Sequence, residues 1–273
     1  METTSPQTPT STLTSAQPPD HAVRTHAKFS PSKLNYLDPE VGGCHGYLNR
    51  EGTSDAAEEG TRLHELMDAA IVEYLKEGRV HSLSAILRMR AIREKWDDST
   101  MFPLQWCAGK LDPYLAKASE VYNEQKVFIR SSSDEPLTSG HYDLLLIFEQ
   151  TAAAMLFDFK FGYNPVEPAA TNRQGLAYAV GVLQKNSNLS RVVSMFLQPA
   201  TGGESFATFF RKDLAQHTAT LTRIVRDAEI LETLLEHEPV ETYVDALTPG
   251  SACTYCARFA GCPAYLRQMK VAV

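Results

Sequence analysis

The chain has 273 residues and a formal net charge of −7, with 43% hydrophobic residues. This length suffices for one large domain or two small ones, and the acidic balance excludes a protein that is basic throughout without excluding a local basic groove. No stretch approaches the roughly 18 uncharged apolar residues of a spanning helix, and no secretory signal is readable, so we expect a cytoplasmic protein without membrane contact.

Residues 1–22 consist mainly of Thr, Ser, Pro and Gln, a composition that predicts a disordered tail. We expect the remainder, residues 23–273, to form a single domain. Its first part, residues 30–120, is predicted to be mainly helical, because apolar residues recur at steps of three and four after Gly60. Further helical stretches are expected at about 81–96 and 103–122.

The pattern changes to strands in the predicted core, residues 121–238. Alternating or wholly apolar runs, which are typical of strands, predict five strands: 121–130, 141–148, 153–161, 191–198 and 205–210. The first three of these are expected to form a meander. Helices are expected at about 170–184 and 214–236. The tail, residues 239–273, carries three cysteines and is predicted to be short and loop-like.

Asp158 and Lys160 are two residues apart in an apolar strand, so their side chains are expected on the same face of the sheet. A structural ion pair would explain them as well as a catalytic role. Asp143 lies in the preceding strand, where an antiparallel hairpin would bring it beside Asp158. Two neighbouring carboxylates repel each other unless a cation lies between them, which predicts an Mg²⁺ or Mn²⁺ site.

Five further residues accompany this predicted metal site. Lys160 would act on the attacking water or stabilise charge on a phosphate, which is the outline of a hydrolytic phosphodiester site. Glu124 is a supporting acid or a solvated strand residue. His64 is a ligand or an ordinary surface histidine on its helix, and Gln174 with Tyr178 forms an i, i+4 pair that simple packing would also explain.

The order of these residues resembles the RecB-like branch of the PD-(D/E)xK nuclease superfamily. The matching motifs are Gly60-x-x-x-His64, Gly140-x-x-Asp143, Asp158-x-Lys160 and Gln174-x-x-x-Tyr178. The resemblance implies an α/β fold with a restriction-endonuclease-like core, a central mixed sheet flanked by helices, and metal-dependent DNA cleavage. It also implies roles: His64, Asp143, Asp158 and the Phe159 carbonyl as metal ligands, Lys160 at the nucleophilic water, and Gln174 and Tyr178 positioning DNA. Asp158 stands where many relatives carry Glu.

The cysteines point to a second metal centre. Five cysteines without a secretory signal favour a metal or cluster site over disulfides, and Cys44, Cys253, Cys256 and Cys262 would suffice for a [4Fe–4S] cluster or a structural Zn²⁺. One cysteine before the core and three after it resembles the AddB and CRISPR-adaptation exonucleases, which implies the iron–sulfur cluster. Cys107 fits a buried core thiol better.

Two functions are therefore predicted as alternatives. The first is a metal-dependent deoxyribonuclease, an exonuclease acting on single strands or DNA ends in recombination, repair, phage DNA processing or CRISPR adaptation, with a partner protein from such a pathway. The second is an inactive DNA-binding or assembly subunit that keeps a structural cysteine-bound metal. Basic residues of the helical region offer a DNA path, or simply a solvated face: Arg62, Arg79, Arg88, Arg90, Arg93, Lys95, Lys110 and Lys117.

Overall fold

The computed structural model describes residues 27–50, 52 and 54–271. The tail predicted to be disordered, residues 1–22, lies outside the described residues. Within the described ranges, no helix combines the length and the apolar character needed to cross a membrane.

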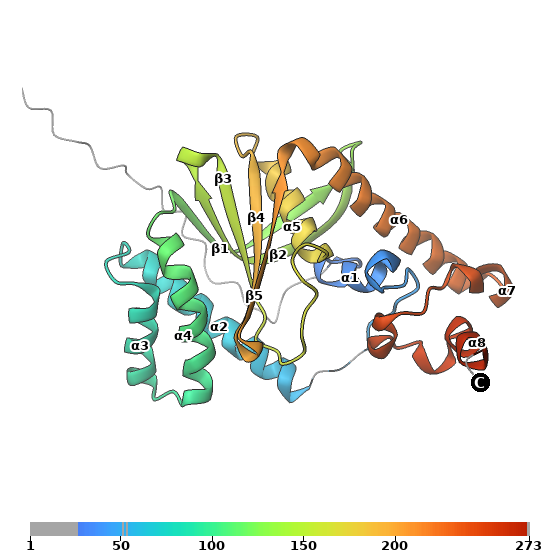
Figure 1. The fold of residues 1–273 in the computed structure, drawn as a ribbon, viewed down its shortest axis with the longest axis horizontal. Coiled ribbons are helices and arrows are strands. Elements are labelled where there is room, and N and C mark those ends of the chain that lie inside the picture. The colour runs from blue at the N-terminus through green and yellow to red at the C-terminus, as the bar shows by residue number, and fades with distance from the viewer. Residues whose placement is uncertain (1–26, 51, 53, 272–273) are drawn as a thin grey trace, which may run out of the picture.

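A five-stranded mixed sheet forms the centre of the molecule (Figure 1). The strands follow one another across the sheet in chain order: β1 Glu120–Arg130, β2 Pro136–Phe148, β3 Ala153–Phe159, β4 Arg191–Gln198 and β5 Gly203–Phe210. All neighbours are antiparallel except β3 and β4, which are parallel. The predicted meander of the first three strands is confirmed, and a helical crossover explains the one parallel pair.

Helices cover both faces of this sheet (Figure 1). The helices of the described residues are α1 Leu34–Leu37, α2 Asp55–Lys76, α3 Leu83–Glu94, α4 Asp98–Leu115, α5 Arg173–Lys185, α6 Leu214–His237, α7 Val240–Tyr243 and α8 Pro263–Val271. The last two, α7 and α8, belong to the tail and lie away from the sheet. The predicted fold class is confirmed: N-terminal helices, a central mixed sheet and C-terminal helices beside several cysteines.

Strand alternation produces two separate cores. On β2, Leu144 and Leu146 pack with α2, α3 and α4, while Leu145 and Ile147 pack with α5 and α6 on the opposite face. Because both faces are covered, the central strands are largely apolar, and a charged side chain within them, such as Asp143 of β2 or Asp158 of β3, carries a burial cost.

Three predicted boundaries were wrong. The helix expected from about Gly60 begins at Asp55, because Ser54 caps it by accepting a hydrogen bond from the Ala57 amide. The helix expected to reach residue 122 ends at Leu115, because the chain joins the β2 ladder from Ser119 onward. The tail is not simply loop-like, since it contains α7 and α8.

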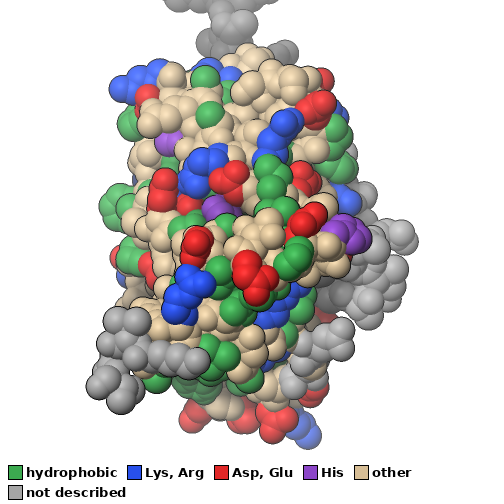
Figure 2. Space-filling view, turned by 90° about the vertical axis from the view of Figure 1, so that its right-hand side faces the viewer, with side chains coloured by type: hydrophobic (Ala, Val, Ile, Leu, Met, Phe, Trp, Pro, Cys, Tyr) green, Lys and Arg blue, Asp and Glu red, His purple; other side chains and the backbone are tan. Residues whose placement is uncertain are grey.

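The tail packs beside the N-terminal loop, about 200 residues earlier in the chain. The Ala252 amide donates to the Gly42 carbonyl at 3.2 Å, and Asn49 forms a β-bridge with Cys256. A Cβ at Gly250 would lie 2.4 Å from the Gly42 carbonyl oxygen, so this close contact requires glycine. On the face that carries the tail, acidic and basic side chains are interspersed (Figure 2), so this face presents no single acidic field.

Candidate active site

Three acidic residues lie in a row across the first three strands. Continuing the register of the neighbouring pairs places Glu124 of β1 opposite Asp143 of β2, and Asp143 opposite Asp158 of β3. Glu124 is buried and has a φ of +50°, a backbone conformation that a glutamate in a strand rarely adopts. Strain of this kind is often kept at functional sites, because it re-aims a side chain.

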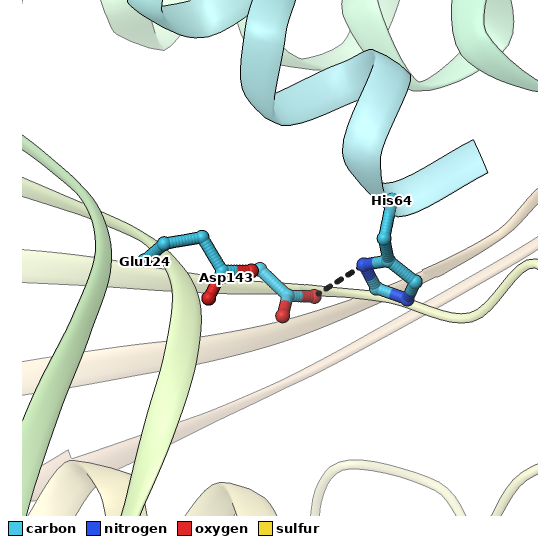
Figure 3. Close-up of side chains that lie close together, drawn as sticks. All are labelled: His64, Glu124 and Asp143. Carbon is cyan, nitrogen blue, oxygen red and sulfur yellow. Dashed lines mark ion pairs between the residues drawn. The ribbon is translucent and has the colours of Figure 1, made fainter. Parts of the chain in front are cut away.

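His64, Glu124 and Asp143 form a candidate metal-binding group (Figure 3). Each offers one donor atom, and these atoms all lie within 4.8 Å of one another. His64 reaches down from α2 toward the sheet, where its Nδ1 lies 3.7 Å from Asp143 Oδ2. The edge of its ring packs against Phe161, which restrains its orientation. The helical histidine that sequence alone left open thus points at the acidic row.

Asp158, Lys160 and Gln174 form a closed polar triangle beside this group. Lys160 Nζ lies 2.7 Å from Asp158 Oδ1 and donates to Gln174 Oε1 at 3.0 Å. Gln174 Nε2 in turn donates to Asp158 Oδ2 at 2.6 Å. The expectation that Asp158 and Lys160 share one face is confirmed. A carboxylate has about four lone-pair positions, so Asp158 keeps acceptor capacity for a cation.

Asp143 is fixed by the backbone at the end of β3. Its Oδ2 accepts a hydrogen bond of 2.7 Å from the Phe159 amide. The ladder between β2 and β3 stops at the pair Leu144 and Phe157, so the Phe159 amide has no strand partner on this side and takes the carboxylate instead. The arrangement holds Asp143 and the Phe159 peptide group together.

Tyr178 supports the site from α5. Its hydroxyl donates to the His141 carbonyl at 2.7 Å. A Cβ at Gly140 would lie 3.0 Å from that hydroxyl and 2.9 Å from Pro31 Cδ, which explains the glycine three residues before Asp143. Tyr178 thus holds β2 against α5 through this hydrogen bond. Its expected role in positioning DNA stays a prediction.

These residues surround one open cavity of about 300 Å³, lined by His64, Asp143, Asp158, Phe159, Lys160, Gln174 and Tyr178 among others. Burial raises the pKa of Asp158 to about 6; the charge of Asp143 also raises it, and that of Lys160 opposes the shift. Burial alone would lower the pKa of Lys160, but the carboxylates of Asp158 and Asp143 outweigh it, and the pKa lies above its usual value.

The donor set of this cavity suits a hard divalent cation. Carboxylate oxygens with one imidazole nitrogen are ligands that Mg²⁺ and especially Mn²⁺ accept. Burial is the main cause of the raised pKa of Asp158 and the charge of Asp143 adds to it; a bound cation would relieve the repulsion between these two carboxylates. The residues present therefore fit the predicted ion.

The four predicted cluster cysteines line another cavity, of about 480 Å³: Cys44, Cys253, Cys256 and Cys262. No three of these described sulfur atoms lie mutually within 4.8 Å, so they do not form a compact group of the kind seen at His64. Backbone amides already approach two of them, with Thr248 donating to Cys44 at 3.4 Å and Gly250 to Cys253 at 3.3 Å. Cys107 is fully buried in the helical core, as predicted.

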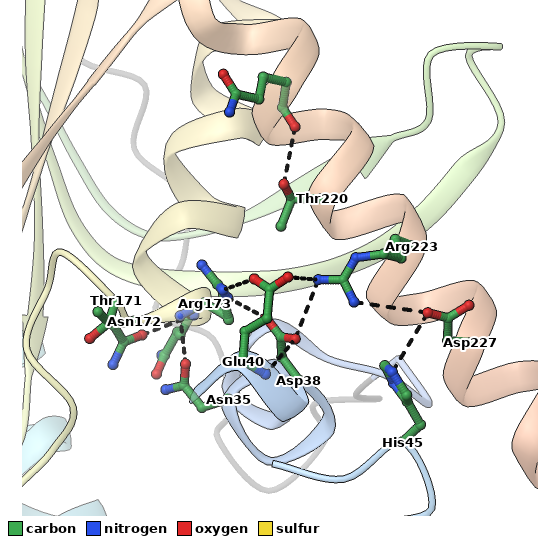
Figure 4. A network of polar contacts seen from close by, with 12 residues as sticks. Asn35, Asp38, Glu40, His45, Thr171, Asn172, Arg173, Thr220, Arg223 and Asp227 are labelled. Atoms are coloured by element: carbon green, nitrogen blue, oxygen red, sulfur yellow. Dashed lines mark hydrogen bonds and ion pairs between the residues drawn. The ribbon is translucent and has the colours of Figure 1, made fainter. Parts of the chain in front are cut away.

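A buried ion-pair network, which sequence reasoning missed, connects the two cavities (Figure 4). Asp38 is fully buried and pairs with Arg173 at 2.6 Å and with Arg223 of α6 at 3.4 Å. Arg173 begins α5 directly before Gln174, and the Asp38 carbonyl accepts from the amide of Gly43, next to Cys44. In the sequence, the pair Asp38-Pro39 indicated a turn, but a turn motif does not show that Asp38 pairs with arginines more than 130 residues away.

Comparison with protein families shows to which family the chain belongs. Residues 45–272 match the family described as "Protein of unknown function (DUF2800)". The chain belongs to this family. No curated protein gives a significant match to this DUF2800 chain. Among solved structures, it is similar to one titled "Crystal structure of SSO0001", with 12% identity and a TM-score of 0.34, covering 74% of this chain and 85% of that chain.

Proposed function

We propose that this DUF2800 protein is a metal-dependent deoxyribonuclease, an exonuclease that hydrolyses phosphodiester bonds. One observation carries the proposal: His64 and Asp143, whose donor atoms lie within 4.8 Å of each other and of a donor atom of the buried Glu124, line a cavity that the ion-paired Asp158 and Lys160 also line. Acids that repel each other, a histidine and an ammonium group at one opening form the donor set for phosphoryl chemistry.

His64, Asp143, Asp158 and the Phe159 carbonyl would hold the Mg²⁺ or Mn²⁺, as the resemblance implies. We add Glu124 to this set, because its carboxylate lies with the His64 and Asp143 donor atoms. When bound, such an ion polarises a phosphate oxygen and makes water a better nucleophile. The chain itself supplies the fixed geometry. The Phe159 amide orients Asp143, and Gln174 orients Asp158, so neither carboxylate must reorganise when the substrate arrives.

Lys160 is assigned the role of an electrostatic stabiliser. Since its pKa is raised above the usual 10.5, the ammonium group stays protonated at neutral pH and does not take a proton from water. Asp158 and Gln174 hold it at the cavity, where it would offset negative charge on the phosphate under attack.

Cys44, Cys253, Cys256 and Cys262 are proposed to hold a structural [4Fe–4S] cluster, with Zn²⁺ as the alternative. The four side chains line one cavity. A single zinc ion binds sulfur at about 2.3 Å, which requires sulfur atoms roughly 4 Å apart, whereas a cluster spans a wider cavity.

A nuclease assay tests the proposal. Purified protein is incubated with end-labelled single-stranded and duplex DNA, with Mg²⁺ or Mn²⁺ and, separately, with chelator. We expect metal-dependent shortening of the labelled strand, lost in Asp158→Ala and in Asp143→Asn, which keeps an oxygen for the Phe159 amide. Cleavage that persists in both variants would contradict the assigned site.

A second candidate is a DNA-binding or assembly subunit that does not cut. It is favoured by the closed triangle of Asp158, Lys160 and Gln174, because both Asp158 oxygens already have partners. Strand binding without cleavage in every metal would support it. The predicted pathways and partner protein stay predictions.

A further inference from the structure

A second hollow opens directly from the candidate active site. It has a volume of about 940 Å³ and shares Ser30, Ser32, Lys160 and Gln174 with the catalytic cavity. This volume lies at the upper end of the range for pockets that enclose small organic ligands, so it accommodates a group the size of a nucleotide. We call this hollow the strand groove.

The cysteine tail forms one wall of the strand groove. Ser251, Ala252, Thr254 and Tyr255 line it from the tail, and Thr254 and Tyr255 are the two residues between Cys253 and Cys256. The groove is therefore bounded on one side by Lys160 and Gln174 of the candidate active site, and on the other by the proposed cluster-binding segment.

Three tyrosine rings form a rigid platform at this wall. Tyr36 stacks on Tyr47 with ring centroids 4.9 Å apart, and its other neighbour is Tyr255, at 5.9 Å. Tyr47 donates from its hydroxyl to Asn49 and to the Tyr255 carbonyl, which fixes the platform to the tail. Tyr255 is 45% exposed and its ring is tilted by 59° from that of Tyr36, so part of this residue is open to a ligand while its neighbours hold it at the wall.

The charges along the groove favour an anionic ligand. Its lining contains Lys33 and Lys160 but a single acid, Glu167, although the whole chain is acidic. Lys160 and Tyr36 both line this groove, so the tyrosine platform and the proposed phosphate position belong to one hollow. An exposed aromatic face next to a cation is the combination that binds single-stranded nucleic acid.

The basic helices considered from sequence are a poorer path. Arg90 pairs with Glu73 and Glu94, and Arg93 pairs with the same two acids, at distances of 3.1 to 3.7 Å. Lys160 is ion-paired too, with Asp158, but it lines both the strand groove and the candidate active site, whereas Arg90 and Arg93 line neither.

We propose that the strand groove binds a single nucleic acid strand, with a base stacked on Tyr255 and the adjoining phosphate at Lys160. The inference rests on the proposed function for the position of the phosphate, and it assigns Tyr255 as a positioning residue.

Strand binding without cleavage tests this assignment. A fluorescein-labelled single-stranded oligonucleotide is titrated with the full chain in chelator, and its anisotropy is measured. Tyr255→Phe keeps the ring, Tyr255→Leu keeps the apolar bulk without the ring, and Phe128→Ala removes an exposed ring on β1 that lines neither cavity. The metal content and visible spectrum of each variant are recorded.

We expect Tyr255→Leu to weaken binding about 5- to 150-fold, the loss typical of one base stacked on an aromatic ring. Tyr255→Phe and Phe128→Ala should bind as the wild type does. Wild-type affinity in Tyr255→Leu, or no binding of the oligonucleotide by the wild type, would overturn the inference. If the wild type binds the strand, loses it with the ring, and cuts nothing with Mn²⁺, the inference holds and the proposed nuclease activity fails. Metal-dependent cutting together with unchanged binding by Tyr255→Leu would support the nuclease and overturn the strand groove.

Discussion

The backbone amide of Phe159 donates a hydrogen bond of 2.7 Å to Oδ2 of Asp143. This contact joins the last residue of β3 to a carboxylate of β2, at the point where the ladder between the two strands has ended. Asp143 therefore has two separable functions, a hydrogen-bond acceptor for the fold and a negative charge for the site.

Substitutions at Asp143 should separate these functions. Asp143→Asn keeps an acceptor oxygen, so we expect near wild-type stability but a loss of Mn²⁺ binding. Asp143→Ala leaves the Phe159 amide without its partner and should also cost about 1–3 kcal/mol in the free energy of unfolding. Urea denaturation and calorimetric titration with Mn²⁺ measure the two effects. Equal destabilisation by both substitutions would show that the charge itself stabilises the fold.

Glu124 should contribute to metal binding although it lies on the outer strand of the row. We expect Glu124→Gln to weaken Mn²⁺ binding about 10- to 100-fold, because it removes one of three converging donors. Glu149→Gln, at an exposed glutamate just after β2, is the matched control and should bind normally. If Glu124→Gln bound Mn²⁺ as tightly as the wild type, Glu124 would not be a metal ligand, and only His64 and Asp143 of the candidate group would remain.

The Asp158 carboxyl should titrate near pH 6 in metal-free protein, because burial is the main cause of its raised pKa. Since the folded pKa exceeds the usual 3.8, the folded state holds a proton that the unfolded state releases between about pH 4 and 6. This contribution to stability is complete below pH 4 and is lost as the pH rises through 6. Carbon-13 NMR of the carboxyl in chelator measures the midpoint, and Mg²⁺ should lower it by favouring the charged form. A midpoint near 4 in chelator would disprove the burial effect.

The cysteine centre should depend on four of the five cysteines. Anaerobically purified wild type is expected to absorb broadly in the visible range, and Cys44→Ser or Cys256→Ser should lose this absorption together with bound iron. Cys107→Ala should keep the colour, because its thiol lies in the separate helical core. If the wild type is colourless and contains one zinc ion per chain, the proposed cluster is wrong and the four cysteines bind zinc instead.

The buried pair of Asp38 and Arg173 should matter far more than a surface pair. Arg173→Met leaves the fully buried Asp38 carboxylate with only the longer ion pair to Arg223, at 3.4 Å. We therefore expect a loss of about 3–5 kcal/mol in unfolding free energy. Arg226→Met breaks an exposed pair with Glu135 and should cost at most about 1 kcal/mol. Urea denaturation compares them, and similar losses would contradict the role of burial.

Much of the architecture could be predicted because it depends on local patterns. The apolar run before Asp158 predicted β3, and the spacing of Asp158 and Lys160 predicted a shared face, which the 2.7 Å contact confirms. The end of α4 was predicted too late, since the residues after Leu115 join β1 through pairing with β2, which helical periodicity does not reveal.

The sequence by itself determined which residue types were available: acids in three successive strands, Lys160 two residues after Asp158, and cysteines near both ends of the described chain. Only the tertiary structure decided which of them meet, because register and helix packing set distances between residues far apart in the chain. Glu124 joined His64 and Asp143 rather than facing solvent, and Tyr255 came beside Tyr36. Long-range packing, with the burial that it imposes, turned separate motifs into a site.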